Sequence, residues 1–250
     1  MSAPEEPKLR VATYNVHGCV GMDGQRSESR IADVIASLSA DIVGLQELDQ
    51  NRARSAAVDQ AGLIAKQLGW HHYFHPAMQR AEELYGDAIL SRYPITVRKA
   101  VELPGNPPWY CRETRGVTWA VAETPLGSVH IINSHFGLGR RERVLQAQLL
   151  TSPEWLGRLP ANTPLIVLGD FNSLPWSRAY RVLESQLRDV RRLVGSPLSF
   201  RTYPTAFPAL AVDHIFVSTA FKPTGVSVHR DAPARVASDH FPLVADLVRS

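Results

Sequence analysis

Short apolar runs that end abruptly in compact polar clusters are the feature that most constrains the fold of this chain. The pattern recurs in VATYNVHG, IVGLQELD, VHIINSHFG, LIVLGDFNS, VDHIFVS and SDHFPLV. Apolar runs of this length, rich in β-branched residues, are typical of buried strands. Functional side chains usually sit on loops at the ends of such strands. We therefore expect polar side chains from several strands to gather where the strands end.

Amphipathic helices alternate with strands at the start of the chain, and consecutive strands follow in the middle. The periodicity predicts helices at 28–38, 58–68, 141–156 and 177–187. It predicts strands at 9–16, 41–45, 87–92, 95–103, 116–123, 129–133, 165–169, 212–218, 225–229 and 241–248. Turn signals at Tyr93-Pro94 and Pro125-Leu126-Gly127 indicate antiparallel hairpins between the middle strands. This mixture predicts an α+β fold with two largely antiparallel sheets face to face and helices outside.

The sequence also indicates how many domains the chain forms and which classes of protein it does not resemble. No repeat, low-complexity tract or Gly/Ser linker interrupts it, so we predict a flexible N-terminus at residues 1–7 and a single domain at 8–250. A hydrophobic fraction of 44% suits one packed globular core. No apolar run approaches the roughly 18 to 20 residues of a membrane-spanning helix, and no secretory signal begins the chain. We therefore expect a cytoplasmic protein without a transmembrane segment.

Cysteine and charge content narrow the kinds of site. Cys19 and Cys111 are too few for a thiolate zinc site, so any metal ion must be held by oxygen or nitrogen ligands. The net charge is only +3. Of the 27 Lys and Arg residues, just four are lysines, so arginine is in large excess. Arginine suits phosphate binding, but a composition bias of the genome is the simpler explanation for its excess.

Each polar cluster has a structural explanation when it is taken alone. Asn15 is in a place typical of turn or cap residues, and GDFNS at 169–173 is compatible with an Asx turn. Glu47 follows a buried run, which leaves an ion pair with an arginine or a metal ion as alternatives. A shared site is favoured because all of these polar residues follow segments that are expected to be neighbouring strands of a sheet. The candidate residues are Asn15, Glu47, His135, Asp170, Asn172, Asp213, Asp239 and His240.

The side-chain types in this set indicate a reaction class. Carboxylates, amides and imidazoles without thiolates suit a hard divalent ion such as Mg²⁺ or Mn²⁺ together with an oxyanionic substrate. A carboxylate beside an imidazole, as in SDHFP and VDHIF, can fix the tautomer of the imidazole and stabilise its charged form. The sequence therefore points to phosphate chemistry.

The same motifs resemble the endonuclease/exonuclease/phosphatase superfamily, which includes deoxyribonuclease I, exonuclease III, neutral sphingomyelinases and inositol polyphosphate 5-phosphatases. The similarity runs in the family's order through TYNVHG, LQELD, YGDAILSRYPI, ETRG, NSHFG, GDFNS, TYP, VDHIF and SDHFPL. GDFN followed at a distance by SDH is highly specific, and YGDAILSRYP and TYP look like the bacterial small-hydrolase or sphingomyelinase-like branch. The resemblance implies a four-layer α/β/β/α sandwich of the deoxyribonuclease I type.

The resemblance also implies a metal site. Glu47 would be the main ligand of Mg²⁺, with Mn²⁺ as a possible substitute, and Asn15 and Asp239 would lie close to the ion or to the phosphate it holds. The chain departs from the exonuclease-type members at His17, where they carry an aspartate, which puts a second acidic metal contact there in doubt. Asp87 stands where many relatives have asparagine, and we assign it no role.

For the reaction itself, the resemblance implies an in-line displacement at phosphorus. Asp170 would orient or deprotonate the attacking water, and Asn172 would position that water or bind phosphate. His135 and His240 would donate to phosphate oxygens, with Asp213 bonded to the imidazole of His240. Such a site combines charge stabilisation of the phosphoryl oxygens with activation of water.

Three functions stay open on the sequence. We favour a divalent-metal-dependent phosphodiesterase or phosphatase, acting as a monomer on a small molecule or a phospholipid head group. A DNA or RNA nuclease is second, because the net charge is small and no aromatic-and-basic interleaving is present. A binding module without catalysis is third, because the set of residues is complete.

Two groups of arginines are candidate phosphate contacts. One group follows NSHFGLG, at 140, 141 and 143, and the other is the pair Arg112 and Arg115. A solvated helix start explains the first group more simply.

Overall fold

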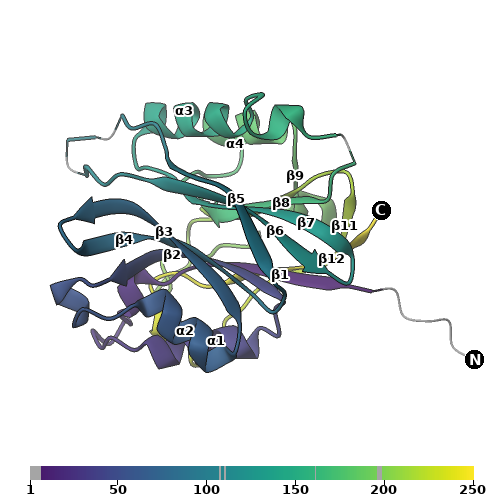
Figure 1. Cartoon of the computed structure of the whole chain (residues 1–250). Helices are drawn as coiled ribbons and strands as arrows, with labels where there is room; N and C mark the ends of the chain where they lie inside the picture. Colours follow the sequence, from purple (N-terminus) through teal and green to yellow (C-terminus); the bar gives the residue numbers. More distant parts are fainter. Residues whose placement is uncertain (1–6, 107, 110, 161, 196–198) are drawn as a thin grey trace, which may run out of the picture.

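Four layers of secondary structure build the molecule (Figure 1). This computed structural model describes residues 7–106, 108–109, 111–160, 162–195 and 199–250, so the predicted flexible segment 1–7 lies outside it apart from Pro7. Two sheets pack face to face between two layers of helices. The helices are α1 (Glu28–Ser37), α2 (Gln60–Leu68), α3 (Arg140–Leu150), α4 (Arg178–Glu184), α5 (Val190–Val194) and α6 (Ala234–Ala237). The predicted α/β/β/α sandwich is confirmed.

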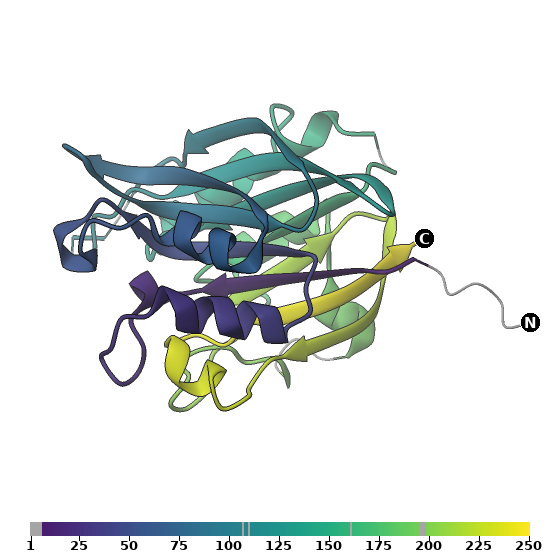
Figure 2. The ribbon, with the colours of Figure 1, turned by 60° about the horizontal axis from the view of Figure 1, so that its bottom comes forward.

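The first sheet has the strand order β11-β12-β1-β2-β4-β3 and is covered by α1 and α2 (Figure 1). Its strands are β1 (Leu9–Asn15), β2 (Ile42–Gln50), β3 (His71–Arg80), β4 (Glu83–Ser91), β11 (Phe221–Val228) and β12 (Leu243–Arg249). Figure 2 shows β1 and β12, from opposite ends of the chain, side by side. Because both ends of the chain contribute to one sheet, we keep the interpretation of residues 8–250 as one domain.

The second sheet has the order β5-β6-β7-β8-β10-β9 and is covered by α3 and α4. Its strands are β5 (Ile95–Glu102), β6 (Gly116–Thr124), β7 (Gly127–His135), β8 (Leu165–Asp170), β9 (Arg188–Asp189) and β10 (Asp213–Val217). Among the described strands, β1 pairs with β2 and β7 with β8 in parallel, and the other pairs are antiparallel. The prediction of two mainly antiparallel sheets is therefore confirmed.

Buried hydrophobic residues fall into clusters that correspond to the interfaces between layers. Successive strand residues point to opposite faces of a sheet, so neighbours enter different clusters. On β1, Val11 packs between the two sheets and Ala12 packs toward α1. On β8, Ile166 packs between the sheets and Val167 packs toward α3 and α4. A four-layer sandwich requires strands that are apolar on both faces, because each sheet is covered on both sides. The continuous hydrophobic runs in the sequence predicted such strands.

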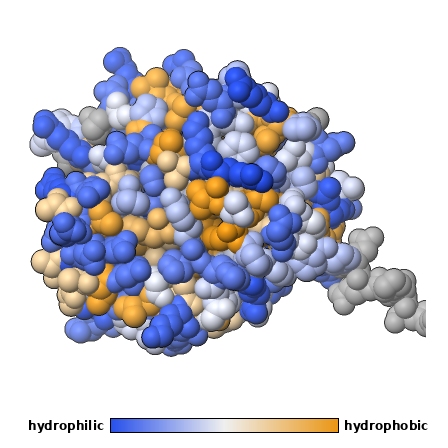
Figure 3. Space-filling model, in the orientation of Figure 1, coloured by the Kyte–Doolittle hydropathy of each residue, from blue (hydrophilic) through white to orange (hydrophobic). Residues whose placement is uncertain are grey.

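The outer surface matches this internal arrangement. Figure 3 shows mainly hydrophilic side chains on the face seen in Figure 1, with hydrophobic side chains in separate patches among them. Within the described ranges, no helix combines the length and the apolar character needed to cross a membrane.

A buried polar contact joins the two sheets beneath the site described below. The Asn133 Nδ2 atom on β7 donates to the carbonyl oxygens of Leu45 and Ala88 on the other sheet, at 3.0 and 2.9 Å. Its Oδ1 atom accepts from Gln46 Nε2 at 2.8 Å, and Gln46 contacts Thr13 Oγ1 in turn. Buried amides of this kind are stable only when they are hydrogen-bonded, so they hold the sheets in one alignment.

Several details of the predicted secondary structure are wrong. The strand predicted at 41–45 continues to Gln50, so Glu47 lies within it and not after it. The chain over 71–80 forms edge strand β3, which Pro76 and a bulge beside it concealed, because proline is tolerated in sheets mainly at edges and bulges. The helix predicted to reach residue 156 ends at Leu150, shortly before Pro153, which disfavours helical backbone at the residue preceding it. The turn at Tyr93-Pro94 connects β4 and β5 of different sheets and forms no hairpin.

We predict that Asn133→Leu lowers the free energy of unfolding by about 3 kcal/mol, because Gln46 Nε2 and the Leu45 and Ala88 carbonyls lose a buried partner. Urea unfolding followed by circular dichroism measures the change. Asn162→Leu, at an exposed position, is the matched control and should change stability by less than about 0.5 kcal/mol. Equal effects of both substitutions would show that the contact between the sheets adds no stability.

Candidate active site

Strand register in the second sheet aligns three of the predicted site residues in a row. His135 ends β7 and lies opposite Asp170, the last residue of β8. Asp213 begins β10 and lies opposite Asp170 on its other side. At Gly169, φ is 150° and an added Cβ atom would lie 1.8 Å from the Ser134 carbonyl oxygen. Glycine therefore lets β8 approach β7 closely just before the carboxylate.

The first sheet supplies Asn15 and Glu47 from its parallel pair of strands. Asn15 ends β1 beside Gln46 of β2. The register of β2 with β4 shifts between Leu45 and Leu48, and Glu47 in this bulge has a φ of 63°. Few residues other than glycine adopt such a φ, and bulges re-aim side chains near functional sites. The bulge thus turns Glu47 toward the second sheet.

A loop between α6 and β12 adds Asp239 and His240 to the same end of the first sheet. Ser238 Oγ donates to the Asn15 carbonyl oxygen at 2.7 Å, which fixes this loop to the end of β1. The Tyr203 ring lies 4.6 Å from the His240 ring, measured between centroids. The imidazole is therefore held on one side by an aromatic ring.

The two halves of the site meet at the Asn15 amide. Its Nδ2 atom donates to Glu47 Oε1 at 2.9 Å and to Asp170 Oδ2 at 3.1 Å, and so bridges the two sheets. His17 Nδ1 lies 3.6 Å from a carboxylate oxygen of Glu47 and 3.6 Å from one of Asp239. Burial raises the pKa of Glu47, but the neighbouring imidazoles of His17 and His135 and the hydrogen bond from Asn15 outweigh it and hold this pKa below its usual range.

His240 lies between two carboxylates. Its Nδ1 atom is 2.9 Å from Asp213 Oδ2, and its Nε2 atom is 3.7 Å from Asp170 Oδ2. Burial lowers the pKa of His240, but the charges of Asp213 and Asp170 outweigh it and raise this pKa to about 10. Burial and the neighbouring Asp213 raise the pKa of Asp170. The arrangement favours a positively charged imidazole beside a carboxyl group that exchanges its proton readily.

The tautomer of His135 follows from its contacts. Arg115 Nη1 lies 3.0 Å from His135 Nδ1, and Asn172 Nδ2 lies 3.0 Å from His135 Nε2 while donating to the Phe136 carbonyl oxygen. A neutral imidazole has only one acceptor nitrogen. Both neighbouring groups can only donate, so one of the two ring contacts has no acceptor. Because the guanidinium is charged and Asn172 Nδ2 already donates to Phe136, we assign Nδ1 as the acceptor from Arg115 and the proton to Nε2, which faces Asp170 Oδ2 at 3.5 Å. Burial and Arg115 together hold the pKa of His135 well below its usual value, so the ring is neutral.

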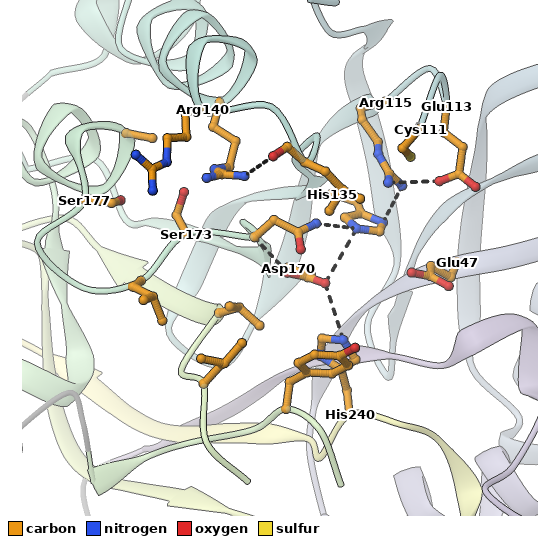
Figure 4. A pocket seen from close by; sticks show the side chains of 18 of the residues that line it. Glu47, Cys111, Glu113, Arg115, His135, Arg140, Asp170, Ser173, Ser177 and His240 are labelled. Carbon is orange, nitrogen blue, oxygen red and sulfur yellow. Dashed lines mark hydrogen bonds and ion pairs between the residues drawn. The ribbon is translucent and has the colours of Figure 1, made fainter. Parts of the chain in front are cut away.

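Most of these side chains, among them Glu47, His135, Asp170, Asp239 and His240, line one large cavity of about 840 Å³. Figure 4 shows Asp170 between His135 and His240, with Glu47 to one side and Arg115 above. Asn172 lines the same cavity, and its backbone N–H donates to Asp170 Oδ1 at 2.9 Å. The Asx turn that the sequence allowed at GDFNS is therefore present, and it holds Asp170 in place within the site.

Comparison with known proteins identifies the family. The sequence model of the Endonuclease/Exonuclease/phosphatase family matches residues 12–240. The chain belongs to this family.

Relatives and solved structures agree with this family assignment. The uncharacterized protein YbhP of Escherichia coli K12 is 31% identical over 257 residues, covering 96% of each chain. An endonuclease/exonuclease/phosphatase from Beutenbergia cavernae has a similar structure, with a TM-score of 0.79, 23% identity, and coverage of 97% of this chain and 72% of that one. A mannosyl-6-phosphatase of Bacteroides thetaiotaomicron has a TM-score of 0.73 and 22% identity, with 96% and 99% covered. At these identities the two structures show the shared fold alone.

All eight residues predicted from the sequence lie around this one end of the sandwich. Asn15, Glu47, Asp239 and His240 come from the first sheet and its loop, and His135, Asp170, Asn172 and Asp213 come from the second. Among the described residues, Glu47 makes no ion pair with an arginine, which was the alternative left open for it.

Sequence reasoning missed the residues that hold the site residues in position. Thr202 Oγ1 donates to Asp213 Oδ2, Ser238 fixes the end of β1, and Tyr203 packs on His240. Arg115 was considered only as a phosphate contact. TYP, SDH and ETRG carried these residues within the family motifs, but nothing in their spacing specified such contacts.

Two groups of side chains in this family member have the composition of a metal site. Ligand atoms of Asp170, Asp213 and His240 lie within 4.8 Å of one another, close enough to hold a metal ion. However, Asp213 Oδ2 and His240 Nδ1 already bond to each other. Glu47 and Asp239 instead direct carboxylate oxygens toward the same His17 nitrogen. Hard oxygen ligands of this kind suit Mg²⁺.

We predict that Arg115→Met releases the tautomer of His135, because the guanidinium donor to Nδ1 is lost. Nitrogen-15 NMR of the imidazole should show the proton on Nε2 in the wild-type chain and a mixture of both tautomers in the variant. Arg112→Met, at an exposed neighbouring position, should leave the wild-type pattern. A wild-type spectrum with the proton on Nδ1 would contradict the assignment.

Proposed function

We propose that the chain is a divalent-metal-dependent phosphoesterase that hydrolyses a phosphate ester of a small molecule by in-line attack of water. The observation that carries this proposal is the position of Asp170. It is buried, it faces the Nε2 atoms of His135 and His240, and it is connected through the Asn15 amide to Glu47. A carboxyl group with a raised pKa between two imidazoles suits proton transfer at a reacting phosphate.

The side chains divide the work of the reaction. Asp170 orients a water molecule and takes up its proton as the new P–O bond forms and the bond to the leaving oxygen breaks. The Nε2–H group of His135 and the charged imidazole of His240 donate to the non-bridging phosphoryl oxygens, where negative charge increases. Asp213 keeps the His240 ring oriented and charged. The leaving oxygen takes up a proton from water in the open cavity.

The donor set at Glu47 fits the predicted cofactor. Glu47 and Asp239, with Asn15 beside them, would hold Mg²⁺ or Mn²⁺, as the family resemblance implies. When bound, the ion supplies positive charge that stabilises the phosphoryl oxygens. Asn15 as found here donates to the carboxylates of Glu47 and Asp170, so its side chain also orients the ligand and the base.

The shape of the cavity favours a small substrate over nucleic acid. A volume of about 840 Å³ lies within the range of roughly 300 to 1,000 Å³ that is common for small-molecule sites. The structural similarity to a mannosyl-6-phosphatase is consistent with a phosphorylated small molecule. A phospholipid head group remains within the same class, and the expected cytoplasmic location and monomeric state stay predictions.

We predict that Asp170→Ala and His240→Ala each lower turnover of a phosphate ester at least about a hundredfold, the typical scale for a catalytic base or an oxyanion donor. Steady-state assays with p-nitrophenyl phosphate and bis-p-nitrophenyl phosphate in Mg²⁺ measure the change. His72→Ala, on the exposed edge strand β3, is the control and should retain wild-type turnover. Full activity in either site variant, with folding confirmed by circular dichroism, would contradict the assigned role.

We predict that Glu47→Gln raises the Mg²⁺ concentration needed for half-maximal rate by at least about tenfold, because one ligand charge is lost. Calorimetric titration of Mg²⁺ without substrate checks the same change independently of turnover. Glu154→Gln, at an exposed position, should leave both titrations unchanged. An unaltered metal titration in Glu47→Gln would exclude Glu47 as a principal ligand.

A further inference from the structure

The cavity extends beyond the reacting centre into a part that the proposed chemistry does not use. We call this part the basic arm. It is lined by Arg140, Arg143, Ser173, Ser177 and Arg178. In Figure 4 its labelled residues lie to the left of Asp170, and Glu47 lies to the right. The arm is therefore placed to contact a portion of the substrate away from the ester that reacts.

Among the described residues, no carboxylate pairs with two of the arginines of the basic arm, Arg140 and Arg178. Within the part of the chain that the structure describes, neither Arg140 nor Arg178 makes a hydrogen bond or an ion pair, whereas Arg143 donates to the Leu138 carbonyl oxygen at 2.7 Å. The nearby Glu142 is buried and accepts from the Gly139 N–H group at 3.2 Å, so it is occupied at the start of α3. The exposed Arg140 and Arg178 guanidiniums thus remain available to an anion.

Ser173 supplies a second and independent indication of a ligand. Its side chain is only 2% exposed, and its Oγ atom has no hydrogen-bond partner among the described residues. Leaving a buried hydroxyl unpaired costs free energy, so such a group in a native structure calls for a partner. Figure 4 shows the hydroxyl pointing into the basic arm. An anionic oxygen bound there would accept a hydrogen bond from it.

We propose that the basic arm binds a second phosphoryl group of the substrate, which makes a small bisphosphorylated molecule the substrate class. This inference rests on the proposed function, because it places the first phosphoryl group at Asp170. Guanidinium groups bind phosphate through paired hydrogen bonds, and the Ser173 hydroxyl adds a neutral donor. Of the acidic residues that line the cavity, Glu47 and Glu113 lie on the other side of Asp170 from the arm in Figure 4. Asp239 lies beside His17, as Glu47 does. An anion in the arm therefore lies near guanidinium and hydroxyl donors and away from these carboxylates.

Calorimetry with a series of probes tests the proposal. The probes are alkanediol bisphosphates of increasing chain length, each compared with the alkyl monophosphate of the same length. They are titrated in Mg²⁺ into the Asp170→Asn chain, in which turnover is blocked. We expect the bisphosphate of optimal length to bind at least about tenfold more tightly than its monophosphate partner, since charge-assisted hydrogen bonds contribute about 1.5 to 3 kcal/mol.

Substitutions in the basic arm identify the residues responsible. Arg140→Gln with Arg178→Gln should reduce the preference for bisphosphate to less than about twofold while leaving monophosphate affinity unchanged. Ser173→Ala should weaken bisphosphate binding about threefold without lowering the melting temperature, because its hydroxyl has no partner among the described residues. Arg141→Gln is the matched control, since Arg141 is exposed in the same turn of α3 but does not line the cavity.

The outcomes separate this inference from the proposed function. Turnover of monophosphates without any preference for bisphosphates would overturn the second subsite and leave the proposed function standing. A bisphosphate preference that depends on Arg140 and Arg178 in a chain that hydrolyses no phosphate ester would support the subsite and overturn the proposed function. An equal loss in Arg141→Gln would also overturn the subsite. Tighter binding of a single-stranded oligonucleotide than of every bisphosphate would reassign the arm to nucleic acid.

Discussion

Hydrogen bonds made by buried amides across the two sheets are the constraint on which the site depends. Asn133 and Gln46 join the sheets in the interior, and Asn15 joins Glu47 to Asp170 at the end of the strands. Hydrophobic packing between sheets is non-directional and tolerates sliding. Amide hydrogen bonds are directional and do not tolerate sliding, because a shift of one sheet against the other would leave buried donors without acceptors. The same kind of contact thus aligns Glu47 of the first sheet with Asp170 of the second.

Local departures from ideal backbone geometry appear where the strands give way to the site. Glu47 in the β2 bulge and Asn172 after β8 both have positive φ values, of 63° and 46°. Such conformations cost energy for residues other than glycine and persist when surrounding contacts fix them. Glu47 is held by Asn15 and His17, and Asn172 is held by its contacts with Asp170 and Phe136. The carboxylate and the amide are therefore aimed by the backbone and locked by their neighbours.

The sequence predicted most strands and helices, and it predicted that the eight candidate residues gather at one end of the fold, because both leave local signals. Apolar runs followed by polar clusters marked the ends of β1, β7 and β8, and the family motifs completed the set. What it could not predict were contacts between segments far apart in the chain. Arg115 fixes the tautomer of His135 across two strands, and Ser238 secures the end of β1 from the last loop. Strand β3 was not predicted, because Pro76 at an edge bulge interrupts the alternation of apolar and polar residues by which a strand is recognised.

The distribution of roles over the fold explains how one scaffold can serve different substrates. The candidate reacting groups come from the ends of β1, β7 and β8, the start of β10, the bulge in β2, and the loops after β8 and before β12. Sheet register fixes the separation of those that lie on strands. The basic arm instead comes from the starts of α3 and α4 and the loop after β8, which lie on the outer side of the second sheet. Side chains at these helix starts can be substituted without disturbing the pairing of the strands. If the proposed function and the second subsite both hold, the sheets carry the reacting groups and the starts of the helices select the rest of the substrate.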